Sequence, residues 1–285
     1  MEPDPVAQAG QGSWARYWAA RSGHSGERDI WWALDRTKFE WLRRQLPPEG
    51  ICLEVGCGSA RLSTLVGTEG LRAVGLDYCA EAAALAQTSF ARAGVRGDVV
   101  MGEALRLPFR DDSVDIVLST GLLEHFEDPA PIVHEMVRVL RPGGLFYSDV
   151  VPKKFSLMCV LDGIGKGQHD HDGIPEYAFK GPQLLTMLRR LGLEAVRVVS
   201  SGVFPPRLPI LGRIRAVREA QGLFCYGTRW LWSALDGTAL AEWLGVYYLC
   251  VGRKTGASPG KSGSQTASRV DNLRRPKAPV AVLKD

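Results

Sequence analysis

The chain has 285 residues, of which 45% are hydrophobic and 23% charged, so it can bury the core of one large domain or two small ones. Its net charge of +4 is too small to indicate a nucleic-acid-binding protein by itself. The six cysteines are scattered and form no CxxC pair, which favours a reducing compartment over a disulfide scaffold or a zinc site. Without a signal-peptide pattern or an apolar stretch of membrane-spanning length, the sequence predicts a cytoplasmic protein.

The first 46 residues are predicted to form a helical lid. Aromatic residues recur among charged ones from Ser13 to Leu46, which indicates two helices separated by the glycine-containing segment 22–26. Residues 1–12 are expected to be a frayed end. Residues 47–50 contain two prolines and a glycine and are expected to precede the first strand.

Strand and helix patterns then alternate along the chain. Strands are predicted at 51–55, 71–76, 97–101, 114–119, 144–151, 194–200 and 246–251, and helices at about 61–67, 79–93, 129–140 and 183–191. Residues 141–144, which contain a proline and two glycines, are predicted to end the third of these helices in a turn. This order predicts an α/β fold in which helices cover both faces of a mostly parallel sheet.

Residues 51–61 form the most informative segment. An apolar run ends in Glu54, and glycine follows at positions 56 and 58, where backbone can approach a ligand closely because no Cβ intervenes. A second apolar run ends in Asp77, about twenty residues further on, where nucleotide-binding βαβ units place an acid on the ribose hydroxyls. Arg61 stands where a dinucleotide-binding motif has its third glycine, which disfavours a dinucleotide site. The Gly-Lys-Ser/Thr ending of a P-loop is also missing, which disfavours a nucleoside triphosphate site.

Several motifs in order between about residues 45 and 203 resemble the class I S-adenosylmethionine-dependent methyltransferases. The similarity is to the small-molecule subfamily related to ubiquinone and menaquinone biosynthesis. The motifs lie at 53–60, 74–77, 102–109, 112–119, 123–129 and 139–144. The resemblance implies a Rossmann-like methyltransferase fold: a doubly wound, mostly parallel seven-stranded sheet whose last strand is antiparallel. It places this domain at residues 47–254, with a hydrophobic insertion at about 204–243.

The resemblance also implies the donor site for S-adenosyl-L-methionine. The methionine half would lie over Gly56 and Gly58, and Asp77 would accept from the ribose hydroxyls. Glu103, where the family usually has Asp, would accept from the adenine amino group. The residues expected to bind the donor are Glu54, Gly56, Cys57, Gly58, Asp77, Tyr78, Glu103, Ala104, Ser119 and Thr120. Ala60 replaces a frequent third glycine, and the alternative that Glu54 or Asp77 only caps a helix stays open.

His125 is the candidate catalytic base. It follows the carboxyl end of the fourth strand, where open α/β sheets place their sites, and its side chain titrates near neutrality. The alternative is that it caps or packs against the following helix. Some related quinone O-methyltransferases bind a divalent metal with a Glu-x-x-Glu-His cluster. Gly121 replaces the first acid here, so no metal site is predicted.

The acceptor is expected to be a small hydrophobic or aromatic molecule, such as a quinone, a lipid or a secondary metabolite. His169, His171 and Tyr177 are predicted to face it from the loop after the fifth strand. The apolar residues of the 204–243 insertion are predicted to cover it, with internal packing or a homodimer face as the alternatives. Residues 255–285 are rich in Gly, Ser, Pro and Lys, which predicts a disordered basic tail.

Two other functions stay open at this point. One is a catalytically silent donor-binding protein with a regulatory or partner role, and the other is a nicotinamide-dependent oxidoreductase. Nucleic-acid methylation is disfavoured, because the sequence has no Asn/Asp-Pro-Pro-Tyr motif and no basic stripe outside the tail.

Overall fold

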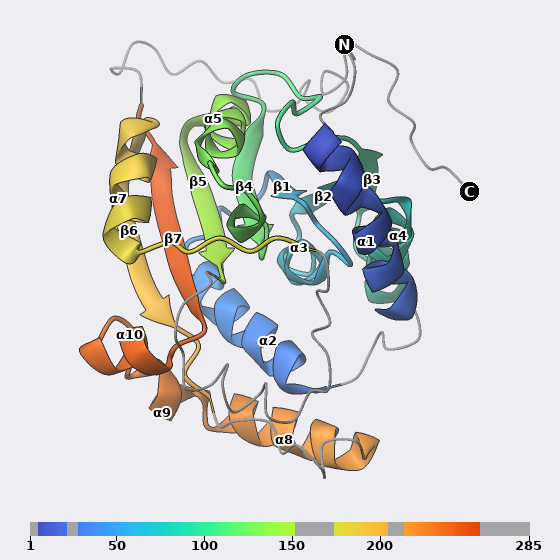
Figure 1. The fold of residues 1–285 in the computed structure, drawn as a ribbon, viewed down its shortest axis with the longest axis vertical. Coiled ribbons are helices and arrows are strands. Elements are labelled where there is room, and N and C mark those ends of the chain that lie inside the picture. The colour runs from blue at the N-terminus through green and yellow to red at the C-terminus, as the bar shows by residue number, and fades with distance from the viewer. Residues whose placement is uncertain (1–4, 22–27, 152–173, 205–213, 257–285) are drawn as a thin grey trace.

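The computed structural model describes residues 5–21, 28–151, 174–204 and 214–256 (Figure 1). Its centre is a single sheet. The strands are β1 (Ile51–Val55), β2 (Arg72–Asp77), β3 (Gly97–Met101), β4 (Val114–Thr120), β5 (Leu140–Val150), β6 (Leu193–Ser201) and β7 (Tyr247–Lys254). The spatial order is β3-β2-β1-β4-β5-β7-β6. Strands β1 to β5 pair in parallel, whereas β7 is antiparallel to both β5 and β6. The predicted seven-stranded sheet with an antiparallel last strand is therefore confirmed.

Helices cover both faces of this sheet. They are α1 (Pro5–Arg21), α2 (Ile30–Arg43), α3 (Arg61–Gly67), α4 (Ala80–Ala93), α5 (Ala130–Val139), α7 (Gly181–Arg190), α8 (Arg215–Gly227), α9 (Arg229–Ser233) and α10 (Ala239–Leu244), with a short 3-10 helix, η2, at Leu123–His125. On one face, Ile132 of α5 and Leu184 of α7 join a core with the alternate residues of the strands. On the other face, Leu34 of α2 and Leu62 of α3 do the same. The two-residue period of the strands and the helical period of the helices thus produce a three-layer structure.

Two sequence-based expectations about boundaries are wrong. Helix α1 begins at Pro5, upstream of the predicted start near Ser13. The segment 141–144 lies inside β5, which already begins at Leu140, instead of forming a turn after the helix. The pairing with β4 shifts register between Val114 and Ile116, so the extra residues of β5 bulge out of the ladder there. Gly143 adopts a φ of +74° in this bulge, which explains why the segment carries glycine within a strand.

No helix in the described ranges is long and apolar enough to cross a membrane.

Candidate functional site

The carboxyl ends of β1, β2 and β3 meet at one edge of the sheet. Val55 pairs with Leu76 in the parallel register, so β1 and β2 end side by side. The backbone N–H of Cys57 donates to the carbonyl oxygen of Leu76 at 2.9 Å, and that of Gly102 donates to the carbonyl oxygen of Asp77 at 3.0 Å. The loops after the three strands are therefore joined by backbone hydrogen bonds, at the edge where open parallel sheets bind their ligands.

The loop after β1 has an unusual backbone. Gly56 and Gly58 have φ values of +64° and +51°, which glycine adopts without a steric penalty. Ala60 has a φ of +54°, a conformation that residues with a Cβ rarely adopt. This explains why the methyltransferases that this chain resembles often have a third glycine at the position of Ala60. The loop turns sharply before α3 begins at Arg61.

Asp77 connects this loop to the end of β2. Its side chain is buried, with 6% of the residue exposed. Its Oδ2 accepts from the backbone N–H of Gly58 at 2.8 Å, and its Oδ1 accepts from that of Cys79 at 3.0 Å. Burial raises the pKa of Asp77, while these backbone donors lower it. Each carboxylate oxygen has a further lone pair, so Asp77 can hold the loop and still accept from a ligand hydroxyl.

Glu54 is buried inside the structure. Its Oε2 accepts from the backbone N–H of Ser63 at 3.1 Å and from the Ser63 hydroxyl at 2.5 Å. Its Oε1 accepts from the Thr120 hydroxyl at 3.2 Å. Burial raises the pKa of Glu54 to about 7, although these hydrogen bonds by themselves would lower it. Glu54 therefore caps the first turn of α3 and holds it to β4, which is the helix-capping alternative left open by the sequence.

The other predicted donor-binding residues differ in accessibility. Glu103 is exposed, and Tyr78 and Ala104 are half-buried. Cys57 is buried, and burial raises the pKa of its thiol well above the ordinary value. Ser119 is fully buried, and its hydroxyl lies 2.9 Å from that of Ser148 on β5. The hydroxyl of Ser119 thus takes part in a hydrogen bond within the sheet.

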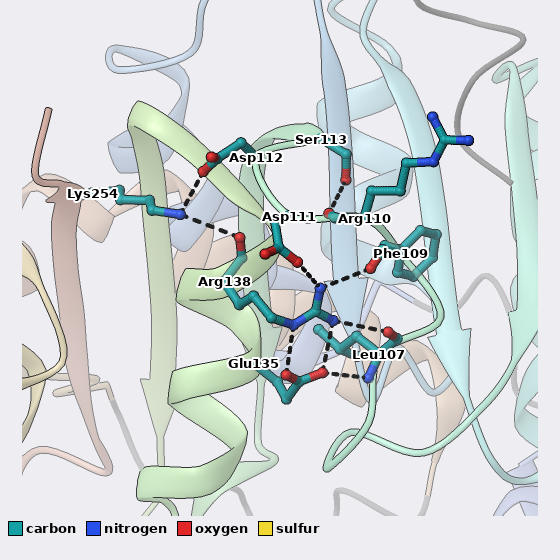
Figure 2. Close-up of polar contacts among 9 residues, drawn as sticks. All are labelled: Leu107, Phe109, Arg110, Asp111, Asp112, Ser113, Glu135, Arg138 and Lys254. Carbon is teal, nitrogen blue, oxygen red and sulfur yellow. Dashed lines mark hydrogen bonds and ion pairs between the residues drawn. The ribbon is translucent and has the colours of Figure 1, made fainter. Parts of the chain in front are cut away.

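Arg138 of α5 anchors the loop that follows β3 (Figure 2). Its guanidinium donates to the carbonyl oxygens of Leu107 at 3.0 Å and Phe109 at 2.9 Å. The same group pairs with Glu135 at 2.7 Å and with Asp111 at 2.6 Å. Glu135 in turn accepts from the backbone N–H of Leu107 at 2.8 Å. These contacts fix the second half of the loop that begins with Glu103 and Ala104.

Side chains lie directly against both glycines of the loop. A Cβ at Gly58 would overlap the ring of Trp18 on α1, and a Cβ at Gly56 would lie 2.7 Å from the Leu122 side chain. The Trp18 ring also contacts the Tyr17 ring, with centroids 5.0 Å apart. The Tyr17 ring in turn contacts the Trp14 ring, with centroids 5.4 Å apart. Helix α1 therefore packs over the glycine loop, and a ligand at the glycines must displace Trp18 or share the space with it.

His125 lies in η2 at the end of this row of rings. Its imidazole ring meets Trp14 edge to face, with centroids 4.9 Å apart. Its Nδ1 lies 2.8 Å from the carbonyl oxygen of Pro175. A carbonyl oxygen only accepts, so Nδ1 carries the proton in this contact and the neutral ring has its lone pair on Nε2. The backbone N–H of Tyr177 donates to the carbonyl oxygen of Glu124 at 2.7 Å, which places the Pro175–Tyr177 segment beside η2. His169 and His171 lie outside the described residues.

Sequence reasoning missed a buried cluster of ionisable side chains near the ends of β4 and β5. Glu124 is 2% exposed, and its Oε1 accepts from the backbone N–H of Val151 at 3.1 Å. Burial raises the pKa of Glu124 to about 8. Asp149 of β5 forms a buried ion pair with Lys38 of α2 at 3.0 Å. The two residues of this pair are far apart in the sequence, and no motif links them, so only the tertiary structure identifies the cluster.

The described part of the 204–243 insertion packs mainly against α2. Gly222 of α8 lies so close to the carbonyl oxygen of Arg28 that a Cβ there would overlap it, and Cys225 joins the core next to α2. Trp32 and Tyr226 also meet edge to face, with centroids 5.1 Å apart. Helices α9 and α10 lie beyond α8 (Figure 1) and expose Trp230 and Trp243. Residues 205–213 lie outside the described part, and the role of the insertion over an acceptor stays a prediction.

Comparison with known proteins agrees with this geometry. Residues 53–148 match the family model of a methyltransferase domain. A Mycolicibacterium smegmatis protein, named as a probable S-adenosylmethionine-dependent methyltransferase, is 32% identical over 120 residues, which are 42% of this chain and 45% of the relative. A ubiquinone biosynthesis O-methyltransferase of Xanthomonas axonopodis pv. citri is 28% identical over 201 residues, 67% of this chain and 80% of the relative.

The fold has counterparts among solved structures. The crystal structure of an S-adenosylmethionine-dependent methyltransferase from Thermotoga maritima superposes with a TM-score of 0.54 at 19% identity, covering 86% of this chain and 99% of that one. The chain thus has the fold of the S-adenosylmethionine-dependent methyltransferases, and its residues 53–148 match the model of the methyltransferase domain family. The methyl donor of this class is S-adenosyl-L-methionine. The match to the Mycolicibacterium relative spans less than half of that protein, 45%.

Proposed function

We propose that this protein binds S-adenosyl-L-methionine at the ends of β1 to β3 and transfers its methyl group to a small hydrophobic or aromatic acceptor. The single observation that carries the proposal is the hydrogen bond from the Gly58 N–H to Asp77 at 2.8 Å. This hydrogen bond joins the loop whose glycines have positive φ values to the buried Asp77 at the end of the neighbouring strand. A nucleoside bound there would meet the backbone of the glycine loop on one side and the carboxylate of Asp77, which can accept from its hydroxyls, on the other.

The residues present fit the chemistry of this donor. S-Adenosylmethionine has a carboxylate, an ammonium group, a ribose and an adenine, but no phosphate. Backbone around Gly56 and Gly58 suits the methionine end, the second lone pairs of Asp77 suit the ribose hydroxyls, and the exposed carboxylate of Glu103 suits the adenine amino group. When bound, the donor supplies an activated methyl group, so the task of the chain is to orient the acceptor for in-line attack.

His125 is the residue proposed to accept the acceptor's proton. Its Nδ1 contact with the Pro175 carbonyl oxygen fixes the ring and leaves Nε2 as the basic atom. In the transfer, the acceptor oxygen, nitrogen or carbon gains the methyl group and loses its proton to Nε2. The Trp14 ring beside His125 provides an aromatic wall at the same place. That wall, together with the relative named as a ubiquinone biosynthesis O-methyltransferase, supports an apolar or aromatic acceptor.

Calorimetric titration of the full chain with S-adenosylhomocysteine, and separately with NADH, tests this function. We expect saturable binding of S-adenosylhomocysteine and no heat of binding with NADH. The opposite pattern would indicate a nicotinamide enzyme. Binding of S-adenosylhomocysteine without turnover on a panel of quinols, phenols and lipids would favour the catalytically silent alternative.

A further inference from the structure

A groove that the proposed methyl transfer does not use lies at the edge of the sheet opposite the glycine loop after β1. It lies between the end of α2 and the strands β6 and β7, is open to solvent, and has a volume of about 400 Å³. Arg253 in its wall pairs with Leu145 near the start of β5, whereas Tyr248 pairs with Val150 at the end of β5. The groove therefore lies at the opposite end of the strands from the carboxyl ends of the parallel strands. Volumes of this size are typical of small-molecule sites.

The wall of the groove is strongly cationic. Arg44, Arg197 and Arg253 line it, and no aspartate or glutamate does. Neither Arg44 nor Arg197 has a side-chain hydrogen bond or ion pair with another residue in the described part of the chain. Within the described ranges, the Arg253 guanidinium has one partner, the neutral carbonyl oxygen of Gly143 at 3.0 Å. Glu194 lies opposite Arg253 in the β6–β7 pairing, but it is not among the lining residues. The three guanidinium groups therefore give the groove an excess of positive charge, which favours a bound anion.

The backbone is distorted at the point where Arg197 enters the groove. The register between β6 and β7 shifts between Glu194 and Arg197, and Ala195 in this bulge has a φ of +50°. Ala195 itself lines the groove. A positive φ at a residue with a Cβ costs free energy. β-Bulges are frequent at sheet edges, where β6 lies, and next to functional sites, where they re-aim a side chain.

The bulge decides which face of the sheet Arg197 occupies. Leu193, Val196 and Val198 all pack in the core on the α5 and α7 face. Strict alternation from Leu193 would also place Arg197 on that apolar face, because side chains repeat every second residue. The extra residue shifts the alternation, so Arg197 joins Trp41 and Arg44 of the α2 side at the groove. The bulge thus adds Arg197 to the cationic wall that Arg44 and Arg253 form.

The geometry points to a binding site for a small phosphate ester that carries an aromatic ring. Guanidinium groups match the oxygens of a phosphate with paired hydrogen bonds, and three of them more than neutralise a doubly charged phosphate. Trp41 forms part of the same wall, so an aromatic group attached to the phosphate has an apolar surface to stack on. This site is distinct from the proposed donor site and goes beyond the proposed function.

Phenyl phosphate is a suitable probe, because it contains both features and no adenosine. We expect saturable calorimetric binding to the full chain that weakens as the salt concentration rises. Phenol and inorganic phosphate, which each contain one of the two features, are expected to bind at least about tenfold more weakly. Absence of saturable binding by phenyl phosphate would overturn the proposal, as would equal affinity for inorganic phosphate, which would leave Trp41 without a role.

Variants locate the site. Arg44→Gln and Arg197→Gln are each expected to weaken phenyl phosphate binding by about tenfold, the effect of losing one charged hydrogen-bond donor. Arg96→Gln is the matched control, because Arg96 is an exposed arginine next to β3, at the far end of the strand order. Unchanged affinity in both groove variants, or an equal loss in the control, would contradict the site. Titration with S-adenosylhomocysteine is expected to give the same affinity in all three variants, so the two proposals can fail separately.

Discussion

Trp18 of α1 packs directly against Gly58 of the loop that follows β1. Gly58 also donates its N–H to Asp77, so one residue contacts both the N-terminal helix and the acid of the predicted donor site. The space next to Gly58 is shared between an indole ring and any ligand of the loop. We therefore expect ligand binding at this loop to depend on the position of α1.

Gly58→Ala is predicted to abolish donor binding and lower stability. The new Cβ would overlap the Trp18 ring, and alanine is strained at a φ of +51°. We expect S-adenosylhomocysteine affinity to fall below detection in calorimetry and the melting temperature to drop. Adding Trp18→Ala is expected to recover part of the stability but not the affinity, because the backbone strain remains. Full recovery of affinity in the double variant would show that the ring clash alone is responsible.

Asp77→Ala is predicted to weaken binding of S-adenosylhomocysteine by about tenfold or more, because a buried acceptor for two hydroxyls is lost. Asp98→Ala is the matched control on the neighbouring strand, where the carboxylate only pairs with the half-exposed Arg72. Calorimetric titration measures both affinities. Equal affinity in the two variants would remove Asp77 from the site.

His125→Ala is predicted to slow turnover without changing donor affinity, because Nε2 is assigned to the acceptor's proton. The rate of S-adenosylhomocysteine release with a methylated acceptor measures turnover, and calorimetry measures affinity. His125→Gln is expected to be equally slow, since its amide has no basic nitrogen. Wild-type rates in both variants would contradict the role of His125 as a base.

The free energy of unfolding is predicted to fall as the pH rises from 5.5 to 8.5. Burial raises the pKa of Glu124 to about 8 and that of Glu54 to about 7, from ordinary values of 4.5. Between pH 4.5 and the raised pKa values, the two carboxyl groups are protonated in the folded state and ionised in the unfolded state. The stabilising contribution of these bound protons is complete below pH 4.5 and is lost as the pH passes the folded-state pKa values.

Glu124→Gln is expected to flatten this pH dependence, because the side chain no longer ionises. Melting temperatures across the pH range are the measurement, and Glu49→Gln, at an exposed position, is the control with an unchanged slope. A slope in Glu124→Gln that equals the wild-type slope would show that Glu124 does not titrate in this range.

Lys38→Met is predicted to destabilise the fold by about 3–5 kcal/mol, because it leaves Asp149 buried without its counter-ion. Burial by itself would lower the pKa of Lys38, but the nearby carboxylate of Asp149 raises it above its ordinary value and keeps the lysine charged. Urea denaturation measures the loss, and Lys38→Met with Asp149→Asn is expected to recover part of it. Arg43→Met is the control: its exposed ion pair with Glu69 should contribute less than about 1 kcal/mol. A small effect of Lys38→Met would mean that water reaches Asp149.

The sequence by itself determined the layered fold and the place of the glycine loop that we propose as the donor site. Apolar runs with a two-residue period between helical patterns can only be buried as strands covered by helices, which fixes the sheet and its two cores. The glycines at 56 and 58 and the acid at 77 are close in the chain, so their meeting at adjacent strand ends follows from a single βαβ unit. The bulge at 141–144 was misread because proline and glycine also mark turns, and its position in β5 depends on pairing with β4.

Only the tertiary structure decided which of the predicted side chains are accessible and what surrounds them. It used Glu54 and Ser119 for hydrogen bonds inside the fold, placed Trp18 on Gly58, and paired Lys38 with Asp149. The same is true of the arginine groove, whose residues come from α2, β6 and β7. Local periodicity has no information about such contacts, because they form between segments that are distant in sequence and meet only when the layers pack.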